Sequence, residues 1–571
     1  MPLIRQLVVI DYSASSDTTH MLVRSSSPTN AEEGSLQLPM QGQGEILRDR
    51  TDEALVDLRG SLSTFLDGFR ASRQSSEGFL KALQGKLKIV LNIHGYSTPL
   101  PNFHRNAFQT TQKKLEKDHE ALPGDKQTFD DYVVFIDFSW PSEQAFSLSP
   151  LSVLRATPFM LRFLLILALL IALVGGKIVS HFALAAGWSL LIGSLAGVLL
   201  GISVALLLLR MVTYFRDRDR AASAAVYDGV ELVRWLHQIF LEEITRAAPQ
   251  IDKVEELRAL LNNAPQPAAV AGPSEADEEP TVELSLLAHS MGCFVATQLV
   301  RTLSDVFDPQ AIQRWQSYGP EGPFSAADPC GPALDQTTTG GIGDLFTLGQ
   351  LVLASPDIPV WALSNGRSNP LQACLRRFKE VFLFTNDADV VLRLLSTFAN
   401  FFVFPSSSRQ GGYRLGNVVP LEGGGRWGKR QLDLTQVGFY GMGGLGRLNT
   451  ALSLTQAPFR TRKVPASRLT LIDCTDYCDE RVSGRDRDWG PRLASKGPGW
   501  RPLRYLFTLG AFVRGKLDPH GGYFQGVFCL DLIYQLLLSG TTKLEAAYPA
   551  LEEQLNRHQI RWIDVQNPPS C

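Results

Sequence analysis

The chain has 571 residues, enough for one large or two ordinary domains with a substantial buried core. Its 55 Lys and Arg against 57 Asp and Glu give a formal net charge of −2, which argues against nucleic acid as a partner. The 7 Cys are scattered, and the CxxxC pair of Cys474 and Cys478 has no second pair nearby, so we predict reduced thiols and no metal site.

Short apolar runs alternate with helical segments along most of the chain, which is typical of a parallel sheet with helical crossovers. We therefore predict an α/β fold with a mostly parallel central sheet and helices on both faces. Val8–Tyr12 and His20–Val23 are expected to form an N-terminal hairpin. The other predicted strands are Lys88–Ile93, Tyr132–Phe138, Val282–Leu287, Leu351–Ala354, Glu380–Phe384 and Leu469–Ile472, and the clearest helices are Cys293–Leu303 and Phe524–Leu538.

Between the predicted strands Tyr132–Phe138 and Val282–Leu287 the composition changes sharply. Pro158–Ile178 is apolar apart from Arg162 and Lys177, and Phe182–Leu209 contains no charged residue. About 20 apolar residues cross a bilayer as a helix, so each stretch is long enough and the short connection makes a helical hairpin. The sequence thus predicts a two-helix transmembrane insertion at 158–209, within an α/β domain formed by 1–157 and 210–571.

Two patterns refine the predicted hairpin. Arginines precede it at Arg155 and follow it from Arg210, which places both of its ends, and with them the rest of the chain, in the cytoplasm. Gly193, Gly197 and Gly201 recur every fourth residue, and such a stripe lets a second helix approach closely. The first helix of the hairpin is the expected partner of this stripe, and a homodimer is the alternative.

Two further segments are interpreted as loops. Asn262–Pro280 is rich in Ala, Pro and acidic residues, so we expect a disordered loop there. Gly441–Gly446 matches GxGxxG, but no strand precedes it and no acidic residue follows at the spacing of a dinucleotide site. No cofactor is predicted.

Ser290 is the candidate nucleophile. It lies in Ala-His-Ser-Met-Gly, directly after the predicted strand Val282–Leu287 and directly before a predicted helix. This is the context of a nucleophile elbow, where a serine occupies a strained turn and small neighbours let the backbone pack around it. Ala288 stands where such elbows usually have glycine.

Attack by a serine on an ester creates an oxyanion, which needs two backbone N–H donors. One donor is expected at Met291, the residue after the nucleophile. The second is expected in the turn after Lys88–Ile93, where Gly95 permits close approach, and we assign it to the N–H of Tyr96. His94 is interpreted as a residue that orders this turn.

The order of a serine hydrolase triad in such folds is Ser, then Asp or Glu, then His. Only His520 and His558 follow Ser290; His520 lies in a loop before an apolar helix, whereas His558 lies in a polar helical run and is expected on a solvated face. We therefore predict His520 as the base. Asp389 is the preferred acid, with Asp387 and then Asp357 as alternatives, because all three follow predicted strands.

Five motifs occur in order along the chain: Ile93-His94-Gly95-Tyr96, Phe138-Ser139-Trp140-Pro141-Ser142, Ala288-His289-Ser290-Met291-Gly292, Leu353-Ala354-Ser355-Pro356-Asp357 and His520-Gly521-Gly522-Tyr523-Phe524. With these motifs the chain resembles the uncharacterised bacterial α/β-hydrolases of the esterase/lipase superfamily. The resemblance implies an α/β-hydrolase fold, a Ser-Asp-His triad and no metal or organic cofactor. Ala288 and the inserted hairpin depart from the family pattern.

The expected function is hydrolysis of carboxylic esters, with lipid or acyl esters favoured by the membrane anchor. A thioesterase or a peptidase with the same triad and a catalytically silent membrane scaffold stay open as alternatives. The expected partners are the lipid bilayer and an ester substrate. The expected location is the bacterial inner membrane, with the catalytic domain in the cytoplasm.

Overall fold

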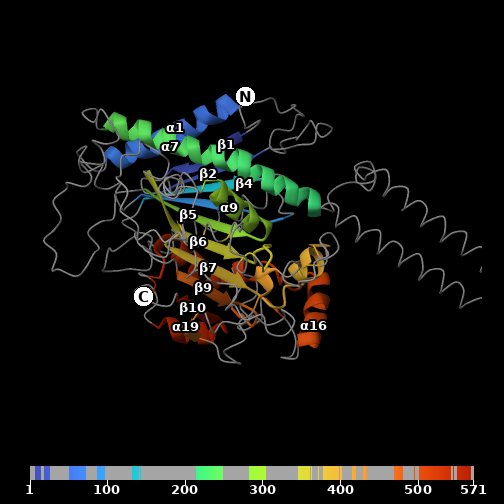
Figure 1. Cartoon of the computed structure of the whole chain (residues 1–571). Coiled ribbons are helices and arrows are strands. Elements are labelled where there is room, and N and C mark those ends of the chain that lie inside the picture. The colour runs from blue at the N-terminus through green and yellow to red at the C-terminus, as the bar shows by residue number, and fades with distance from the viewer. Residues whose placement is uncertain are drawn as a thin grey trace, which may run out of the picture.

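The computed structural model describes the parts of the chain that form the sheet, the helices around it and the loops at one of its edges (Figure 1). These are residues 7–14, 18–25, 51–71, 87–96, 132–140, 142, 214–247, 282–303, 345–360, 362, 371, 374, 377–397, 399–400, 414–418, 428–433, 468–479, 494–495, 501–541, 544 and 550–566.

The strands are β1 (Leu7–Ala14), β2 (Thr18–Ser25), β3 (Leu87–Ile93), β4 (Tyr132–Ser139), β5 (Val282–His289), β6 (Phe346–Ala354), β7 (Glu380–Thr385), β8 (Gly428–Asp433), β9 (Arg468–Asp473) and β10 (Arg561–Gln566). They form one ten-stranded sheet in the order β1-β2-β4-β3-β5-β6-β7-β9-β10-β8. β1 runs antiparallel to β2 and β9 antiparallel to β10, and the other neighbouring strands are parallel. The sheet is therefore mixed but mostly parallel, as the alternation of apolar runs predicted.

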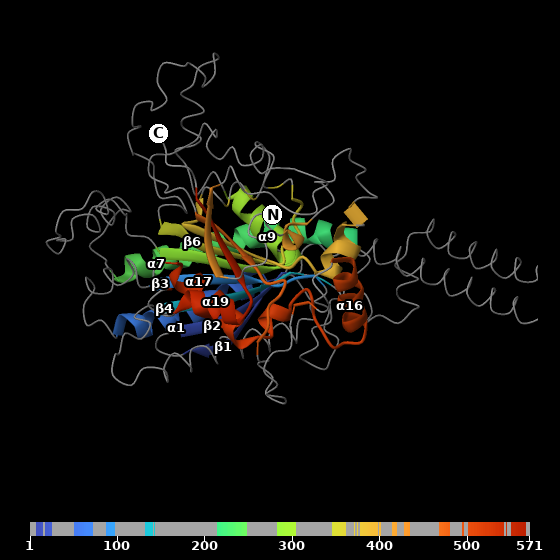
Figure 2. The same cartoon turned by 90° about the horizontal axis from the view of Figure 1, so that it is seen from below.

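The helices are α1 (Thr51–Ala71), α7 (Val230–Ala247) with the π-helical turn η1 (Ala225–Gly229) before it, α9 (Met291–Thr302), the π-helical η2 (Val391–Ser396), the short η4 (Leu415–Asn417), α16 (Arg501–Val513), η7 (Gly522–Phe524), α17 (Val527–Ser539) and α19 (Leu551–Arg557). α1, α7 and α9 contribute to one hydrophobic core, whereas α17 and α19 contribute to another. Figure 2 shows the helices distributed about the sheet from a second side.

Both cores draw on the same central strands. Leu286 of β5 and Leu353 of β6 belong to the first core, and their chain neighbours Leu287 and Val352 belong to the second. Successive side chains of a strand point to opposite faces, so a strand covered on both faces must be apolar at consecutive positions. This is why the central strands read as continuous apolar runs, and each fully buried leucine contributes about 1.5–3 kcal/mol.

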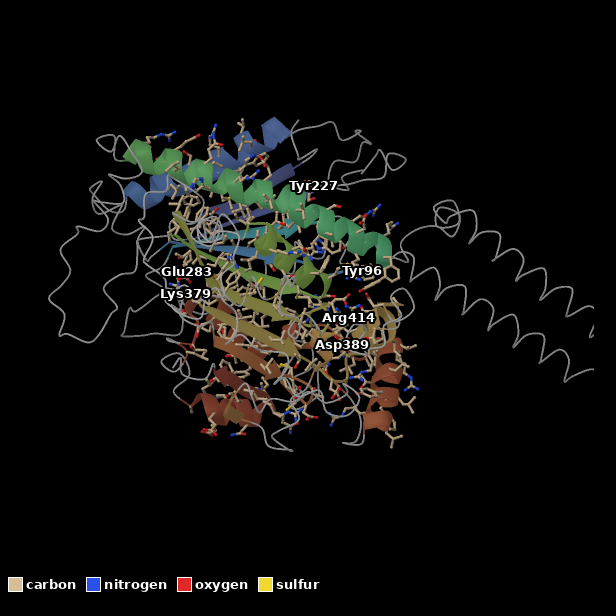
Figure 3. All side chains as sticks on the ribbon, in the orientation of Figure 1. Tyr96, Tyr227, Glu283, Lys379, Asp389 and Arg414 are labelled. Atoms are coloured by element: carbon tan, nitrogen blue, oxygen red, sulfur yellow. The ribbon has the colours of Figure 1, made fainter. Side chains whose placement is uncertain are left out.

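The parallel pairing brings the carboxyl ends of β3, β5, β6 and β7 to one edge of the sheet. Figure 3 shows Tyr96, Asp389 and Arg414 at this edge, and Glu283 and Lys379 at the opposite one. In open α/β sheets ligands bind at the carboxyl edge. The loops after these strands are therefore the candidate ligand-binding region.

The strands expected from the sequence are confirmed, and so is the antiparallel N-terminal hairpin, which forms β1 and β2. Several elements were not expected, among them α1, α7, α16, β8 and β10. In β10, the sequence Arg-Trp-Ile-Asp-Val-Gln interrupts its apolar residues with charged ones, so no apolar run marks it. Its central residue Ile563 is nevertheless buried in the first core.

The predicted membrane hairpin at 158–209 lies outside the described residues, as do its boundaries with 1–157 and 210–571. Within the parts of the chain that the structure does describe, no helix has the length and apolar character needed to cross a bilayer. The predicted loop Asn262–Pro280, the glycine stripe Gly193/Gly197/Gly201 and the Gly441–Gly446 segment also lie outside them. These remain predictions.

Candidate active site

Ser290 occupies a sharp turn between β5 and α9. Its backbone has φ 55° and ψ −123°, a conformation that residues other than glycine rarely adopt and that costs on the order of 1–3 kcal/mol. Hydrogen bonds to the end of β6 and to the loop after it hold Ser290 there: its N–H donates to the carbonyl of Ala354 at 2.8 Å, and its carbonyl accepts from the N–H of Asp357 at 3.1 Å. This is the strained strand-to-helix turn that the Ala-His-Ser-Met-Gly sequence predicted.

The small residues around Ser290 are required by close packing. A Cβ on Gly292 would lie 2.4 Å from the carbonyl oxygen of His94 and 2.5 Å from that of Ile93. A Cβ on Gly95 would lie 2.7 Å from Nδ1 of His289 and 2.9 Å from Cβ of Ser290. The turn after β3 is therefore packed directly against the serine turn, and neither glycine can carry a side chain without movement.

The residues predicted as oxyanion donors lie on the two sides of this contact. Met291 is the first residue of α9, so the helix itself has no acceptor for its N–H. Tyr96 follows Gly95, and its half-buried ring packs against the first core and edge-on against Tyr214 at 6.3 Å between centroids. The two backbone segments that meet at Gly95 and Ser290 are thus the two on which the donors were expected.

His94 orders the turn after β3. Its ring is buried and stacks on Trp140 with 5.4 Å between centroids. Nδ1 lies 2.8 Å from the carbonyl of Gly95 and Nε2 lies 3.0 Å from the carbonyl of Trp140, while the indole Nε1–H donates to the carbonyl of His94 at 2.8 Å. These contacts fix the turn that carries Gly95 and Tyr96.

Asp389 and His520 are brought together from loops that are distant in the sequence. Nδ1 of His520 lies 2.6 Å from Oδ2 of Asp389, which is fully buried. The other carboxylate oxygen accepts the backbone N–H groups of Val391 and Leu392, both at 3.0 Å. One oxygen of Asp389 is therefore anchored to the start of η2 and the other is directed at the imidazole.

The alternative acids are engaged elsewhere. Asp387 pairs with Arg393 at 2.7 Å and accepts the hydroxyl of Tyr505 at 3.0 Å. Asp357 lies 3.2 Å from Nε of Arg414, and its other oxygen accepts the Ser396 hydroxyl at 3.0 Å. These alternatives lie at the same edge, but the carboxylate in contact with His520 is that of Asp389.

The pKa of His520 is raised above 6.5. Burial acts to lower it, but the charge of Asp389 and its hydrogen bond to the imidazole outweigh burial, with smaller contributions from Asp518 and Asp357. A carboxylate in this position also fixes the tautomer, because it accepts the Nδ1–H and leaves Nε2 as the basic nitrogen.

His289, which the sequence reasoning passed over, joins Ser290 to His520. Its ring lies 4.7 Å from that of His520 between centroids, and its Nε2 lies 3.2 Å from the His520 carbonyl. Burial, followed by the neighbouring His520, lowers the pKa of His289 to about 3, so it is neutral and can donate its Nε2–H to that carbonyl. Ser290 and His520 both belong to the described chain, and no hydrogen bond joins the serine hydroxyl directly to the imidazole.

The loop that carries His520 is held by side chains that sequence reasoning also missed. Asn386 donates from Nδ2 to the carbonyl of Pro519 at 2.6 Å. Oδ1 of Asp518 accepts the N–H groups of His520 and Gly521, both at 3.0 Å. The only signal for Asn386 was its place in Asn-Asp-Ala-Asp after a predicted strand, beside the preferred acid.

The expectation that His558 lies on a solvated face is wrong. Its ring is buried and stacks on Phe528 with 4.3 Å between centroids, and Nδ1 lies 3.0 Å from the carbonyl of Cys478. The polar residues around it in the sequence suggested exposure, but the histidine lies at the end of α19 and packs against α17. It contacts none of the candidate catalytic residues in the described chain.

Comparison with models of protein families, with curated proteins and with solved structures gave no match for this chain. Within the described residues, no group of three or more His, Cys, Asp or Glu side chains is arranged to hold a metal ion.

Proposed function

We propose that this protein is a membrane-anchored serine hydrolase with an α/β-hydrolase fold that cleaves carboxylic esters. The mostly parallel sheet, the positive φ of Ser290 between β5 and α9, and the order Ser290, Asp389, His520 along the chain all support this proposal. The membrane anchor is the segment 158–209.

The main support for a serine hydrolase is the combination of the serine turn with an Asp-His pair. The strained serine turn lies at the same sheet edge as a buried aspartate that is hydrogen-bonded to a histidine, and the residue before the serine contacts that histidine. A serine helix cap would account for Ser290 at the start of α9, but not for its strain or for the Asp389–His520 pair. The two features together favour nucleophilic catalysis.

In the proposed reaction, Oγ of Ser290 attacks the ester carbonyl carbon while Nε2 of His520 takes the hydroxyl proton. Asp389 orients the imidazole and stabilises the imidazolium. The N–H groups of Met291 and Tyr96 bind the oxyanion, His520 returns the proton to the leaving alcohol, and water then hydrolyses the acyl-enzyme. The serine–histidine hydrogen bond of such enzymes is often long without substrate and tightens in the complex.

The segment 158–209 is proposed as an anchor because it is apolar and because the described residues nearest to it in the sequence lie beside the site. The last described residue before it is Ser142, whose hydroxyl donates to the carbonyl of Gly95 at 3.4 Å. The first described residue after it is Tyr214, whose ring packs edge-on against Tyr96. Both flanks therefore lie against the proposed oxyanion turn, which favours a substrate that reaches the site from a membrane.

A fluorophosphonate probe, which reacts only with activated serines, tests the proposal. The full chain should be labelled, and Ser290→Ala should abolish labelling. The matched control is Ser355→Ala, because Ser355 also has a positive φ, 43°, directly after the adjacent strand β6. Its hydroxyl oxygen, however, accepts a hydrogen bond from the Tyr523 hydroxyl. Labelling that survives in Ser290→Ala, or is lost only in Ser355→Ala, would overturn the assignment. A chain that folds but is never labelled would favour the silent scaffold.

A further inference from the structure

α16 presents its apolar side outward. Leu503, Leu506, Phe507 and Val513 are exposed, and we call them the outer face of α16. Leu506, Phe507 and Val513 are 65%, 53% and 75% exposed. The spacing from Leu503 through Leu506 and Phe507 to Val513 puts these residues on one side of a helix.

The opposite side of α16 is the more polar one, and it faces the protein. Thr508 is fully buried, Arg504 pairs with Asp476 at 3.1 Å, and the Tyr505 hydroxyl donates to Asp387 at 3.0 Å. A helix on the surface of a soluble protein normally buries its apolar side and exposes its polar side. α16 is inverted, so a cover for the outer face is expected.

The charge around α16 indicates what kind of cover it is. From Arg501 to Leu517 the sequence has Arg501, Arg504, Arg514 and Lys516 and no acidic residue. Arg514 and Lys516, just beyond the end of the helix, are exposed. An apolar helix face with exposed basic residues at its end resembles helices that lie in the interface of an anionic bilayer.

The location of α16 is consistent with a bilayer as the cover of its outer face. Figures 1 and 2 both show it at the side of the molecule toward which the strands' carboxyl ends point. It leads into the loop of His520, and the same edge holds Ser142 and Tyr214, the described residues nearest in the sequence to the apolar segment 158–209.

We propose that the outer face of α16 docks into the surface of an anionic lipid bilayer, as a second membrane contact beside the segment 158–209. The apolar side chains enter the interface, and Arg514 and Lys516 contact lipid phosphates. Docking would direct the carboxyl edge of the sheet toward the membrane. The proposal does not require Ser290 to be a nucleophile, since it concerns only the position of α16.

Photo-cross-linking of the full chain tests this directly. p-Benzoylphenylalanine is placed at Leu506, and the protein is reconstituted into vesicles of phosphatidylcholine with or without phosphatidylglycerol. We expect lipid adducts at Leu506, and more of them with phosphatidylglycerol. Each basic residue near an anionic surface contributes roughly a fivefold gain in binding, so Arg514→Gln with Lys516→Gln should remove most of that increase.

The matched control is Val56 of α1, an exposed apolar residue that is 63% accessible on a helix distant from α16 in both views. The same photoreactive residue at Val56 should give few lipid adducts in either vesicle. A cross-linked dimer from Leu506 would instead identify a second copy as the cover, and a cross-link to a peptide from 158–209 would identify the chain's own segment. Either product in place of lipid adducts, or equal lipid adducts at Leu506 and Val56, overturns the proposal.

Discussion

Asp389 and His520 are 131 residues apart in the chain, and a 2.6 Å hydrogen bond joins them. Asp387, only two residues before Asp389, instead pairs with Arg393 and Tyr505. The two aspartates lie on the same short loop but serve different partners, so their substitution should have different consequences.

The first prediction separates these two carboxylates. Asp389→Asn should lower ester hydrolysis by a factor on the order of 10³ or more, as should Ser290→Ala and His520→Ala, because members of a triad act as a unit. Asp387→Asn should keep most of the activity and lower the melting temperature, since it weakens the contacts that hold α16 and η2. The measurement is kcat/KM together with thermal unfolding. A severe loss of activity in Asp387→Asn with a mild one in Asp389→Asn would mean that the acid was assigned wrongly.

The second prediction concerns pH. His520 must be neutral to accept a proton, and its pKa is raised above 6.5 by Asp389 against the opposing effect of burial. The rate of fluorophosphonate labelling should therefore rise with pH, with a midpoint above 6.5. His289, with a pKa of about 3, cannot account for such a midpoint. A midpoint at or below 6.5 would contradict the proposed pairing of His520.

The same pairing has an effect on stability with the opposite direction. Because the folded pKa of His520 is raised, the charged pair stabilises the fold fully below the unfolded pKa of about 6.5 and loses this contribution as pH rises through the folded pKa. His520→Gln should therefore lower the melting temperature more below pH 6.5 than in alkaline buffer. An equal loss at both pH values would mean that the pair contributes no charge-dependent stability.

The sequence predicted the elements whose partners are local and missed those set by distant contacts. The strand before Ser290 and the helix after it are marked by continuous apolar residues, so the turn between them could be predicted. His289 could not be recognised, because its role depends on the loop of His520, which is 231 residues away. α16 was missed although its apolar residues recur at helical spacing, and its outward orientation depends on distant contacts such as those of Arg504 with Asp476 and Tyr505 with Asp387.

The choice among the acids shows the same limit. Asp357, Asp387 and Asp389 all follow strands of a parallel sheet, and the chain order of a triad allows each of them. They are distinguished by their partners: Asp389 contacts His520, whereas Asp357 pairs with Arg414 and Asp387 with Arg393. Such long-range pairing is not encoded in the spacing of any motif.

A fourth prediction uses the two glycines beside Ser290. Gly95→Ala should sharply reduce activity, because the new Cβ must displace His289 or the turn of Ser290. Gly292→Ala should mainly destabilise the fold, because its Cβ would meet the carbonyl oxygens of Ile93 and His94. The control is Gly60→Ala in α1, where nothing lies within 4 Å and alanine should stabilise the helix by up to about 1 kcal/mol. Activity and thermal unfolding are measured for all three variants; full activity in Gly95→Ala would remove the close approach from the argument.

The last prediction connects the segment 158–209 to the substrate. Ser142 and Tyr214, the described residues on its two sides, both contact the turn of Gly95 and Tyr96, so the two flanks lie close together. A flexible linker should therefore replace 158–209 without disturbing the sheet. We expect the shortened chain to be released from membranes and to hydrolyse short, water-soluble esters at a rate close to that of the full chain.

The shortened chain should act more slowly on esters presented in vesicles, because a tether raises the effective concentration of substrate at the site. The comparison is between the two chains on the same pair of substrates, with Ser290→Ala as the blank in each. A parallel loss on both substrates would indicate that the deletion damaged the site. Equal rates on vesicles would mean that 158–209 does not assist access to lipid. A loss confined to vesicles would indicate that the substrate enters from the bilayer, beside the proposed oxyanion turn that Ser142 and Tyr214 contact.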